Sequence, residues 1–385
     1  MTIGINGNEA NVEHRVGVGQ YAYELISNLK VQSTKHHFNT LVYLNSQPRQ
    51  DMPAPAKYWN YQVFGPQRLW TLTALQKKLI DQKRSGVLPD IFFTPTHYTP
   101  LYMPTPSVIS IMDLSVERFP EFFKRKDYFQ LKYWTQASVL IAKKIITISE
   151  HSKKELCNLY AVSPDKVVVT YPGYDSKRFK PVAKNKRSRL VGKLNKYKIE
   201  DQKYFLFLGT LQPRKNLTRL IEAFATLGNN NLKLVIVGMN TEGRGGWMQQ
   251  PIFDKVNQLG LSKKVIFTGF IPDADVPILM AGSKAFVLPS LYEGFGIPPI
   301  EAMATGVPVV VSKVSSLPEI CGLAATYIDN PYEVGSIQQA LQEVLLQTPS
   351  QRARKVRLGM EWVKRYNWDN TAKKTLQVLY DAAQR

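Results

Sequence analysis

Residues 285–309 read AFVLPSLYEGFGIPPIEAMATGVPV and carry the clearest signal of the fold class. A short apolar run (AFVL) leads into a loop with two glycines (EGFG). Two prolines then favour the first turn of a helix, and a second apolar run begins at Val307. Strand, glycine loop, helix and strand in this order predict one repeat of a parallel α/β sheet.

The rest of the second half follows the same pattern. Leu217, Leu220, Ile221 and Phe224 have the spacing of an amphipathic surface helix, with Asn216 expected as its N-cap. Apolar runs of strand length, typical of parallel strands covered on both faces, occur at Tyr204–Leu208, Leu232–Val237, Val265–Phe267, Ala285–Leu288 and Val307–Val311.

The first half repeats this logic. Gly17-Val18-Gly19 precedes an expected helix from Gln20 to Leu29. Strands are expected at Ile3–Asn6, Asn39–Tyr43, Ile91–Phe93, Ser107–Ile111, Lys144–Ile148 and Val167–Val169. The sequence therefore predicts two doubly wound, Rossmann-like α/β domains, with a ligand held in the cleft between them.

Composition narrows the class of protein. The length of 385 residues suits about two domains, and 44% apolar with 21% charged residues suits globular ones. Two distant cysteines exclude a disulfide framework and a cysteine-rich zinc site. No signal peptide or membrane-spanning run is recognised, so a cytoplasmic location is expected. A net charge of +20 indicates an anionic partner: nucleic acid, anionic lipid or a phosphorylated metabolite.

The expected domain boundary lies in a basic segment. Residues 1–175 form the expected first domain, 176–203 the linker and 204–364 the second domain. Seven basic residues and no acidic one occur between 184 and 198, a composition typical of a solvated linker.

Two carboxylates and two cations are the candidate site in the second domain. Glu293 in the glycine loop and Glu301 in the expected first helical turn could reach different parts of one bound molecule. Glycine-loop N–H groups and a helix N-terminus favour an anion there. Arg214 and Lys215 offer a guanidinium fork and a point charge suited to a departing phosphate. The alternatives are that Glu301 only complements the helix dipole and that the cations are solvated.

The stretch from Glu293 to Val309 resembles the E-x7-E signature of retaining GT-B glycosyltransferases of the family-four group. The resemblance implies a GT-B fold in which Glu293 contacts the hydroxyls of the donor sugar and Glu301 contacts the ribose. It places Gly294, Phe295 and Gly296 in the donor-binding loop. The block around Arg214 and Lys215 is similar to the part of the family that holds the donor pyrophosphate.

The first half carries looser parts of the resemblance. Gly17 and Gly19 match the loop that closes over the donor phosphates, and Asp113 matches a catalytic, acceptor-side carboxylate. Met112 stands where many relatives have histidine, so His97 on a neighbouring loop is either its substitute or an ordinary surface histidine. Residues 365–385 resemble the closing segment and helix that cross back to the first domain.

No metal and no cofactor are expected. Asp273-Ala274-Asp275 could be taken for a metal-binding D-x-D motif, but an N-cap and a first-turn aspartate explain it more simply. The resemblance implies a donor substrate, with GDP-mannose the first choice and a UDP-hexose the next.

The expected function is retaining, metal-independent transfer of a mannose- or glucose-type hexose to a lipid-linked or polysaccharide acceptor. The alternatives are a nucleotide-sugar epimerase on the same fold, or a basic binding protein with a degenerate site. No RNA- or DNA-binding motif is recognised, so nucleic acid is not expected as a partner, and an anionic membrane surface stays open. Phe119, Phe122, Phe123, Tyr128 and Phe129 interleave with Arg118, Lys124, Arg125 and Lys126, so they form either a peripheral membrane face or part of the core.

Overall fold

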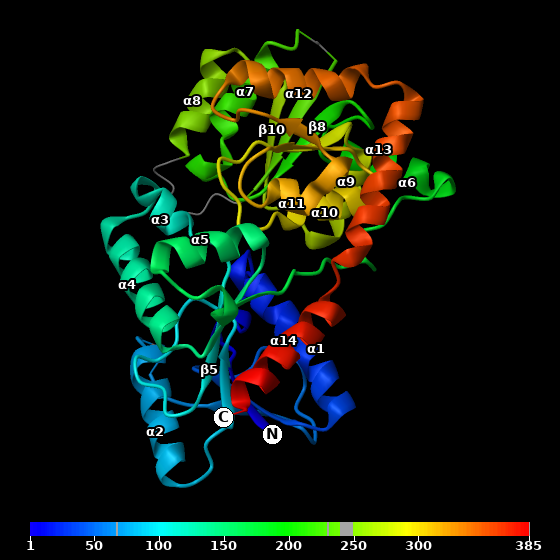
Figure 1. The fold of residues 1–385 in the computed structure, drawn as a ribbon. Helices are drawn as coiled ribbons and strands as arrows, with labels where there is room; N and C mark the ends of the chain where they lie inside the picture. Colours follow the sequence, from blue (N-terminus) through cyan, green and yellow to red (C-terminus); the bar gives the residue numbers. More distant parts are fainter. Residues whose placement is uncertain (67, 229–230, 239–248, 385) are drawn as a thin grey trace. The chain divides into compact units, whose positions relative to one another are not determined.

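A computed structural model describes residues 1–66, 68–228, 231–238 and 249–384. The chain forms two compact units (Figure 1): the first contains 1–173 and 366–385, and the second contains 174–365. The expected linker, 176–203, is thus part of the second unit, and the chain returns to the first unit after Arg365.

The first unit is built on a parallel sheet of order β3-β2-β1-β4-β5-β6-β7. Its order reverses between β1 and β4, as in a Rossmann-like fold. Parallel pairing is continuous, for example Ile3 with Ile91 and Ile109 with Ile145. The α/β class predicted from sequence is confirmed. The strands are β1 (Thr2–Asn6), β2 (Asn39–Leu44), β3 (Trp59–Val63), β4 (Ile91–Thr94), β5 (Ser107–Ile111), β6 (Lys144–Thr147) and β7 (Val167–Val169).

Helices cover this sheet on both faces. A core cluster that includes Ile109, Ile145, Val139 and Leu156 packs α4 and α5 on one face. Helix α14 contacts α1 and strands β4, β5 and β6. The helices are α1 (Val18–His36), α2 (Gln76–Arg84), α3 (Ser115–Arg118), α4 (Arg125–Ile141), α5 (Glu150–Tyr160) and α14 (Trp368–Ala383).

The return of α14 to the first unit has specific contacts. The side chain of Gln32 on α1 donates a hydrogen bond of 2.8 Å to Asp369. The Thr371 hydroxyl donates one of 2.6 Å to the Tyr171 carbonyl. Gly173 lies so close that a Cβ there would be 2.3 Å from the Trp368 nitrogen, so only glycine fits beneath the start of α14.

The second unit repeats the doubly wound design. Its parallel sheet has the order β10-β9-β8-β11-β12-β13, which reverses between β8 and β11. The strands are β8 (Tyr204–Leu208), β9 (Lys233–Val237), β10 (Val265–Gly269), β11 (Ala285–Leu288), β12 (Val309–Ser312) and β13 (Thr326–Ile328).

Helices also flank the second sheet. Helix α7 packs against α8 and α12, and α10 packs against α9 and α13 (Figure 1). The helices are α6 (Arg187–Asn195), α7 (Leu217–Ala225), α8 (Gln250–Gln258), α9 (Val276–Gly282), α10 (Ile297–Ala304), α11 (Leu317–Cys321), α12 (Val334–Leu346) and α13 (Pro349–Trp362).

The basic segment is not a solvated linker. Residues 187–195 form α6, which packs against α9 and buries Leu190 and Leu194. These two leucines lie one turn apart and give the helix a buried edge, whereas Arg189 and Lys193 are exposed. Arg187 further pairs with the carboxylate of Asp201.

Two strands have no counterpart in the sequence-based prediction. Strand β3 lies at the edge of the first sheet and only Trp59 in it is buried, so it lacks the apolar run of a central strand. Strand β13 spans three residues at the edge of the second sheet. Over the described ranges, no helix combines the length and apolar character needed to cross a bilayer.

Candidate active site

The site residues of the second unit gather at its topological switch point. Arg214 and Lys215 lie in a 3-10 turn after β8, and Glu293 lies in the loop after β11. Because β8 and β11 are neighbours, their carboxyl ends bring the two loops together. The Leu291 backbone N–H donates to the Arg214 carbonyl at 2.8 Å, which ties one loop to the other.

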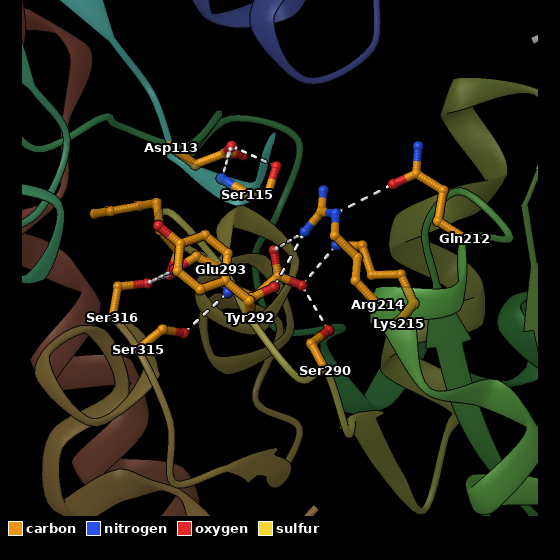
Figure 2. Close-up of polar contacts among 11 residues, drawn as sticks. Asp113, Ser115, Gln212, Arg214, Lys215, Ser290, Tyr292, Glu293, Ser315 and Ser316 are labelled. Atoms are coloured by element: carbon orange, nitrogen blue, oxygen red, sulfur yellow. Dashed lines mark hydrogen bonds and ion pairs between the residues drawn. The ribbon is translucent and has the colours of Figure 1, made fainter. Parts of the chain in front are cut away.

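Glu293 is the centre of this cluster (Figure 2). The Lys215 ammonium donates to its Oε1 at 2.6 Å, and the Arg214 guanidinium approaches its Oε2 at 3.3 Å. The Ser290 hydroxyl also donates to Oε1, at 2.6 Å. The side chains of Arg214, Lys215 and Glu293 are only 18%, 12% and 8% exposed. Two predicted cations and one predicted carboxylate thus form one buried ionic cluster.

The cluster fixes the charge of Glu293. Burial by itself would raise the pKa of this carboxyl, but Lys215 and Arg214 outweigh burial and hold the pKa below its usual value. Glu293 is therefore an ionised carboxylate at neutral pH. It serves as the internal counter-ion of the two cations.

The glycine loop enters α10 as its sequence predicts, with one difference. Gly296 precedes the helix with φ of +102°, a conformation that favours glycine, and prolines occupy the first turn. Gly294 and Phe295 are buried beside it. Glu301 is the fifth residue of α10, because the helix begins at Ile297, and no acidic residue lies in the first turn. The prediction that placed Glu301 there is wrong, which removes the helix-dipole alternative for this half-buried side chain.

Asn216 differs from its expected role. It precedes α7 in a left-handed conformation, and its side chain accepts no capping hydrogen bond from the helix. Its amide instead donates to the carbonyls of Pro289 and Pro331, at 3.1 and 2.7 Å. Asn216 therefore holds together the loops around the switch point rather than capping a helix.

Three serines that contact Glu293 were not predicted from the sequence. Ser290 contacts the carboxylate, Ser315 accepts a hydrogen bond from the Glu293 backbone N–H at 2.9 Å, and Ser316 donates to the Glu293 carbonyl at 2.9 Å. The signal available in the sequence is a Ser-Ser pair just after an apolar strand. Such a pair is ordinary loop composition, and only the fold brings it to Glu293.

The site residues of the first unit lie at the carboxyl edge of its own sheet. Gly17, with φ of +51°, immediately precedes α1, and Gly19 packs so that a Cβ there would be 3.0 Å from the Glu9 carbonyl oxygen. Asp113 follows β5, and its Oδ1 accepts hydrogen bonds from the backbone N–H and hydroxyl of Ser115 at 3.0 and 2.7 Å.

His97 is not the exposed loop histidine of the simpler interpretation. It follows β4, the neighbour of β5, and is half-buried. Burial lowers the pKa of His97, whereas the charge of Asp113 acts in the opposite direction. Met112, in contrast, is buried in the core and offers no polar group.

The D-x-D-like segment is already engaged. Asp275 accepts hydrogen bonds from the Tyr197 hydroxyl and the Lys196 ammonium rather than capping α9. Asp273 is exposed and pairs with Arg178 at 3.7 Å. No side-chain capping hydrogen bond forms at either helix start, so the expected N-cap bond is absent, whereas the first-turn position is confirmed: both aspartates lie in the first turn of the 3-10 helix Asp273–Asp275. Within 1–66, 68–228, 231–238 and 249–384, no group of three or more potential ligands could hold a metal ion.

This arrangement is suited to a ligand with a phosphate group. Cationic side chains at the carboxyl edge of a doubly wound sheet bind anions, and an adjacent carboxylate can accept hydrogen bonds from hydroxyl groups. The two doubly wound units and this cluster define an α/β protein with a candidate site for a phosphorylated ligand.

Comparison with known proteins gives the family. Residues 16–178 match the model described as Glycosyltransferase Family 4, and residues 193–357 match Glycosyl transferases group 1. O-antigen chain mannosyltransferase B of Escherichia coli is 28% identical over 375 residues, which cover 94% of each chain. O-antigen chain mannosyltransferase RfbU of Salmonella typhimurium is 30% identical over 275 residues, 71% of this chain and 69% of the relative.

Solved structures agree on the fold. HepE of Anabaena, crystallised with UDP-glucose, superposes with a TM-score of 0.76 at 19% identity, covering 99% of this chain and 100% of the other. The chain belongs to the family-four glycosyltransferases and has the GT-B fold. It is a hexosyltransferase.

Proposed function

We propose that this hexosyltransferase takes mannose from GDP-mannose and transfers it, with retention and without a metal, to a lipid-linked or polysaccharide acceptor. The observation that carries the proposal is the buried pairing of Arg214 and Lys215 with Glu293. It supplies two positive charges for a diphosphate and one carboxylate for a sugar. No further cofactor enters the proposed reaction.

The relatives support the choice of sugar and acceptor. Both relatives described above, from Escherichia coli and Salmonella typhimurium, are named as O-antigen chain mannosyltransferases. A UDP-hexose is the next candidate donor, since HepE was crystallised with UDP-glucose.

The ionic cluster suggests how donor binding prepares the reaction. Without donor, Glu293 pairs with Lys215 and Arg214 and offsets one of their two positive charges. A donor diphosphate brings its own negative charge to the cations, and Glu293 then becomes available to the sugar hydroxyls. Because the cations are largely shielded from water, their stabilisation of the leaving diphosphate is stronger than it would be in solution.

The transfer itself needs little from the protein besides position and charge. The bond between the anomeric carbon and the phosphate oxygen breaks, and the acceptor oxygen bonds to that carbon on the same face. The acceptor proton passes to the departing phosphate, so no strong protein base is required. Asp113 and His97 are the polar groups of the first unit proposed to orient the acceptor.

A nucleotide panel tests the donor assignment. Thermal unfolding with GDP, UDP, ADP and their sugar conjugates should show the largest shift for GDP and GDP-mannose. A ligand at 100 times its dissociation constant stabilises by about 2.7 kcal/mol. Product analysis by NMR should then show an α-linked mannoside. Release of an isomerised nucleotide sugar would favour an epimerase, and a β-linked product would contradict retention.

We further propose that the enzyme works at an anionic membrane surface. Helix α4 carries outward-facing apolar side chains: Phe129, Tyr133 and Leu140 are 49%, 56% and 71% exposed. Their spacing places them on one helical stripe. Exposed cations at its start (Lys124, Arg125 and Lys126) complement anionic headgroups.

Vesicle co-sedimentation tests this surface. Binding to vesicles with anionic lipid should exceed binding to neutral ones and weaken as salt rises. Leu140→Ser should reduce binding, whereas Leu346→Ser, an 81% exposed leucine on α12, serves as the matched control. Equal loss in both variants, or equal binding to neutral vesicles, would contradict the proposed surface.

A further inference from the structure

Two consecutive serines hold the backbone of the loop that carries Glu293. Ser315 and Ser316 follow β12, which pairs with β11 in the sheet. The Ser315 hydroxyl oxygen accepts the Glu293 backbone N–H at 2.9 Å. The Ser316 hydroxyl lies 2.9 Å from the Glu293 carbonyl and 3.0 Å from that of Phe295, and donates to them. Both sides of the Glu293 backbone are thereby hydrogen-bonded to one turn.

The backbone conformation of this turn indicates that the serine hydroxyl groups have a specific role. Ser315 has φ of +50°, in the left-handed region that non-glycine residues rarely adopt. Glycine would fit this conformation without the steric penalty but would lack the acceptor oxygen. Ser316 is completely buried. The turn therefore keeps a serine where the backbone alone favours glycine.

The carboxylate and the backbone of Glu293 are held by different partners. Lys215, Arg214 and Ser290 contact its carboxylate, and these cations are the groups assigned to the diphosphate. The hydroxyl groups of Ser315 and Ser316 contact its backbone and that of Phe295. Once a diphosphate occupies the cations, the serine pair still fixes the position from which the Glu293 side chain projects.

We propose that Ser315 and Ser316 are positioning residues that aim Glu293 at the donor sugar after the diphosphate has replaced it on Arg214 and Lys215. This inference rests on the proposed function. It separates sugar positioning, which depends on the serine pair, from diphosphate binding, which depends on the cations.

Ser315→Gly is the most informative variant, because it removes the hydroxyl while relieving the backbone. GDP release from GDP-mannose, GDP affinity by calorimetry and thermal stability are measured on the full chain. We expect kcat to fall roughly tenfold, with GDP affinity within about twofold of wild type and no loss of stability. Ser316→Ala should show the same split between kcat and GDP affinity.

Ser312→Ala is the matched control. Ser312 lies at the end of the same strand and is completely buried, and its hydroxyl has no hydrogen-bond partner among the described residues. Its kcat should stay within about twofold of wild type.

The outcomes distinguish a failure of the positioning role from a failure of the proposed function. Wild-type kcat in both Ser315→Gly and Ser316→Ala would overturn the inference, as would a fall in GDP affinity equal to the fall in kcat. If the wild-type enzyme releases no nucleoside diphosphate from GDP-mannose or any UDP-hexose, the proposed function fails first, and the positioning role falls with it.

Discussion

Replacing Glu293 by glutamine is the most direct test of the ionic cluster. The change keeps the shape of the side chain and its capacity to hydrogen-bond with Ser290, but it removes the negative charge that pairs with Lys215 and Arg214. Stability, diphosphate binding and turnover should therefore respond differently.

The expected loss of stability depends on how deeply the two cations are buried. Removing one partner of a buried ion pair costs about 3–5 kcal/mol, because the other charge remains uncompensated. The two cations here keep 18% and 12% exposure, so water partly screens them and we take the lower end, about 3 kcal/mol. For a unit of this size, that loss lowers the unfolding midpoint by roughly 6–12 °C.

A bound diphosphate should reverse much of this loss. In Glu293→Gln the cations have no competing carboxylate, so GDP should bind at least as tightly as to wild type. Turnover should nevertheless fall by two orders of magnitude or more, on the order of 3 kcal/mol in the barrier, since the contact with the sugar is lost as it departs. Thermal unfolding, calorimetry with GDP and steady-state kinetics measure the three effects.

Glu361→Gln is the control for this experiment. Its side chain is 73% exposed and pairs with Lys364 on the surface, so stability should change by less than about 1 kcal/mol. A Glu293→Gln variant as stable as this control, or one that loses GDP affinity together with turnover while still folded, would contradict the role given to the ionic cluster.

Three further predictions follow from the same site. Glu301→Ala should weaken GDP by about 10- to 150-fold in calorimetry, the effect of losing a charged hydrogen bond of roughly 1.5–3 kcal/mol; unchanged affinity would exclude the ribose contact. Sugar transfer should survive excess EDTA, whereas loss with EDTA and recovery with magnesium or manganese would show a metal requirement. Because the pKa of folded Glu293 lies below its usual value of about 4.5, its contribution to stability is present above that pH and is lost as pH falls through the folded value. Acid unfolding of Glu293→Gln should therefore be less steep than that of wild type below about pH 4, and equal slopes would argue against an ionised Glu293.

Much of the fold follows from the sequence because central parallel strands are apolar on both faces. Tyr204–Leu208, Ala285–Leu288 and Ser107–Ile111 are strands with the predicted bounds. The edge strand β3 was not predicted because only one of its residues is buried. It therefore lacks the continuous apolar run by which a strand covered on both faces is recognised. Helix α6 was not predicted because the many cations of its segment indicate a solvated linker, and only two buried leucines, Leu190 and Leu194, indicate a packed helix.

The candidate site was also predictable only in part. The residue types and their order along the chain identify Glu293, Arg214 and Lys215 as candidates, since diphosphate and sugar chemistry demand cations and carboxylates. The sequence cannot show that Glu293 and Lys215, 78 positions apart, meet at 2.6 Å. That contact depends on β8 and β11 being neighbours in the sheet.

Predictions of helix capping from neighbouring residues also failed where the side chain hydrogen-bonds to a residue far away in the sequence. Asn216 caps no helix because its amide reaches Pro289 and Pro331, 73 and 115 residues away. Asp275 likewise bonds to Tyr197 instead of the helix that follows it. The class of fold and the chemical groups of the site could be predicted from the amino-acid sequence, because periodicity and residue chemistry are local properties. The partners of those groups could not, and with them the charge state of Glu293 and the roles of Ser315 and Ser316, because strand order brings together residues far apart in the chain.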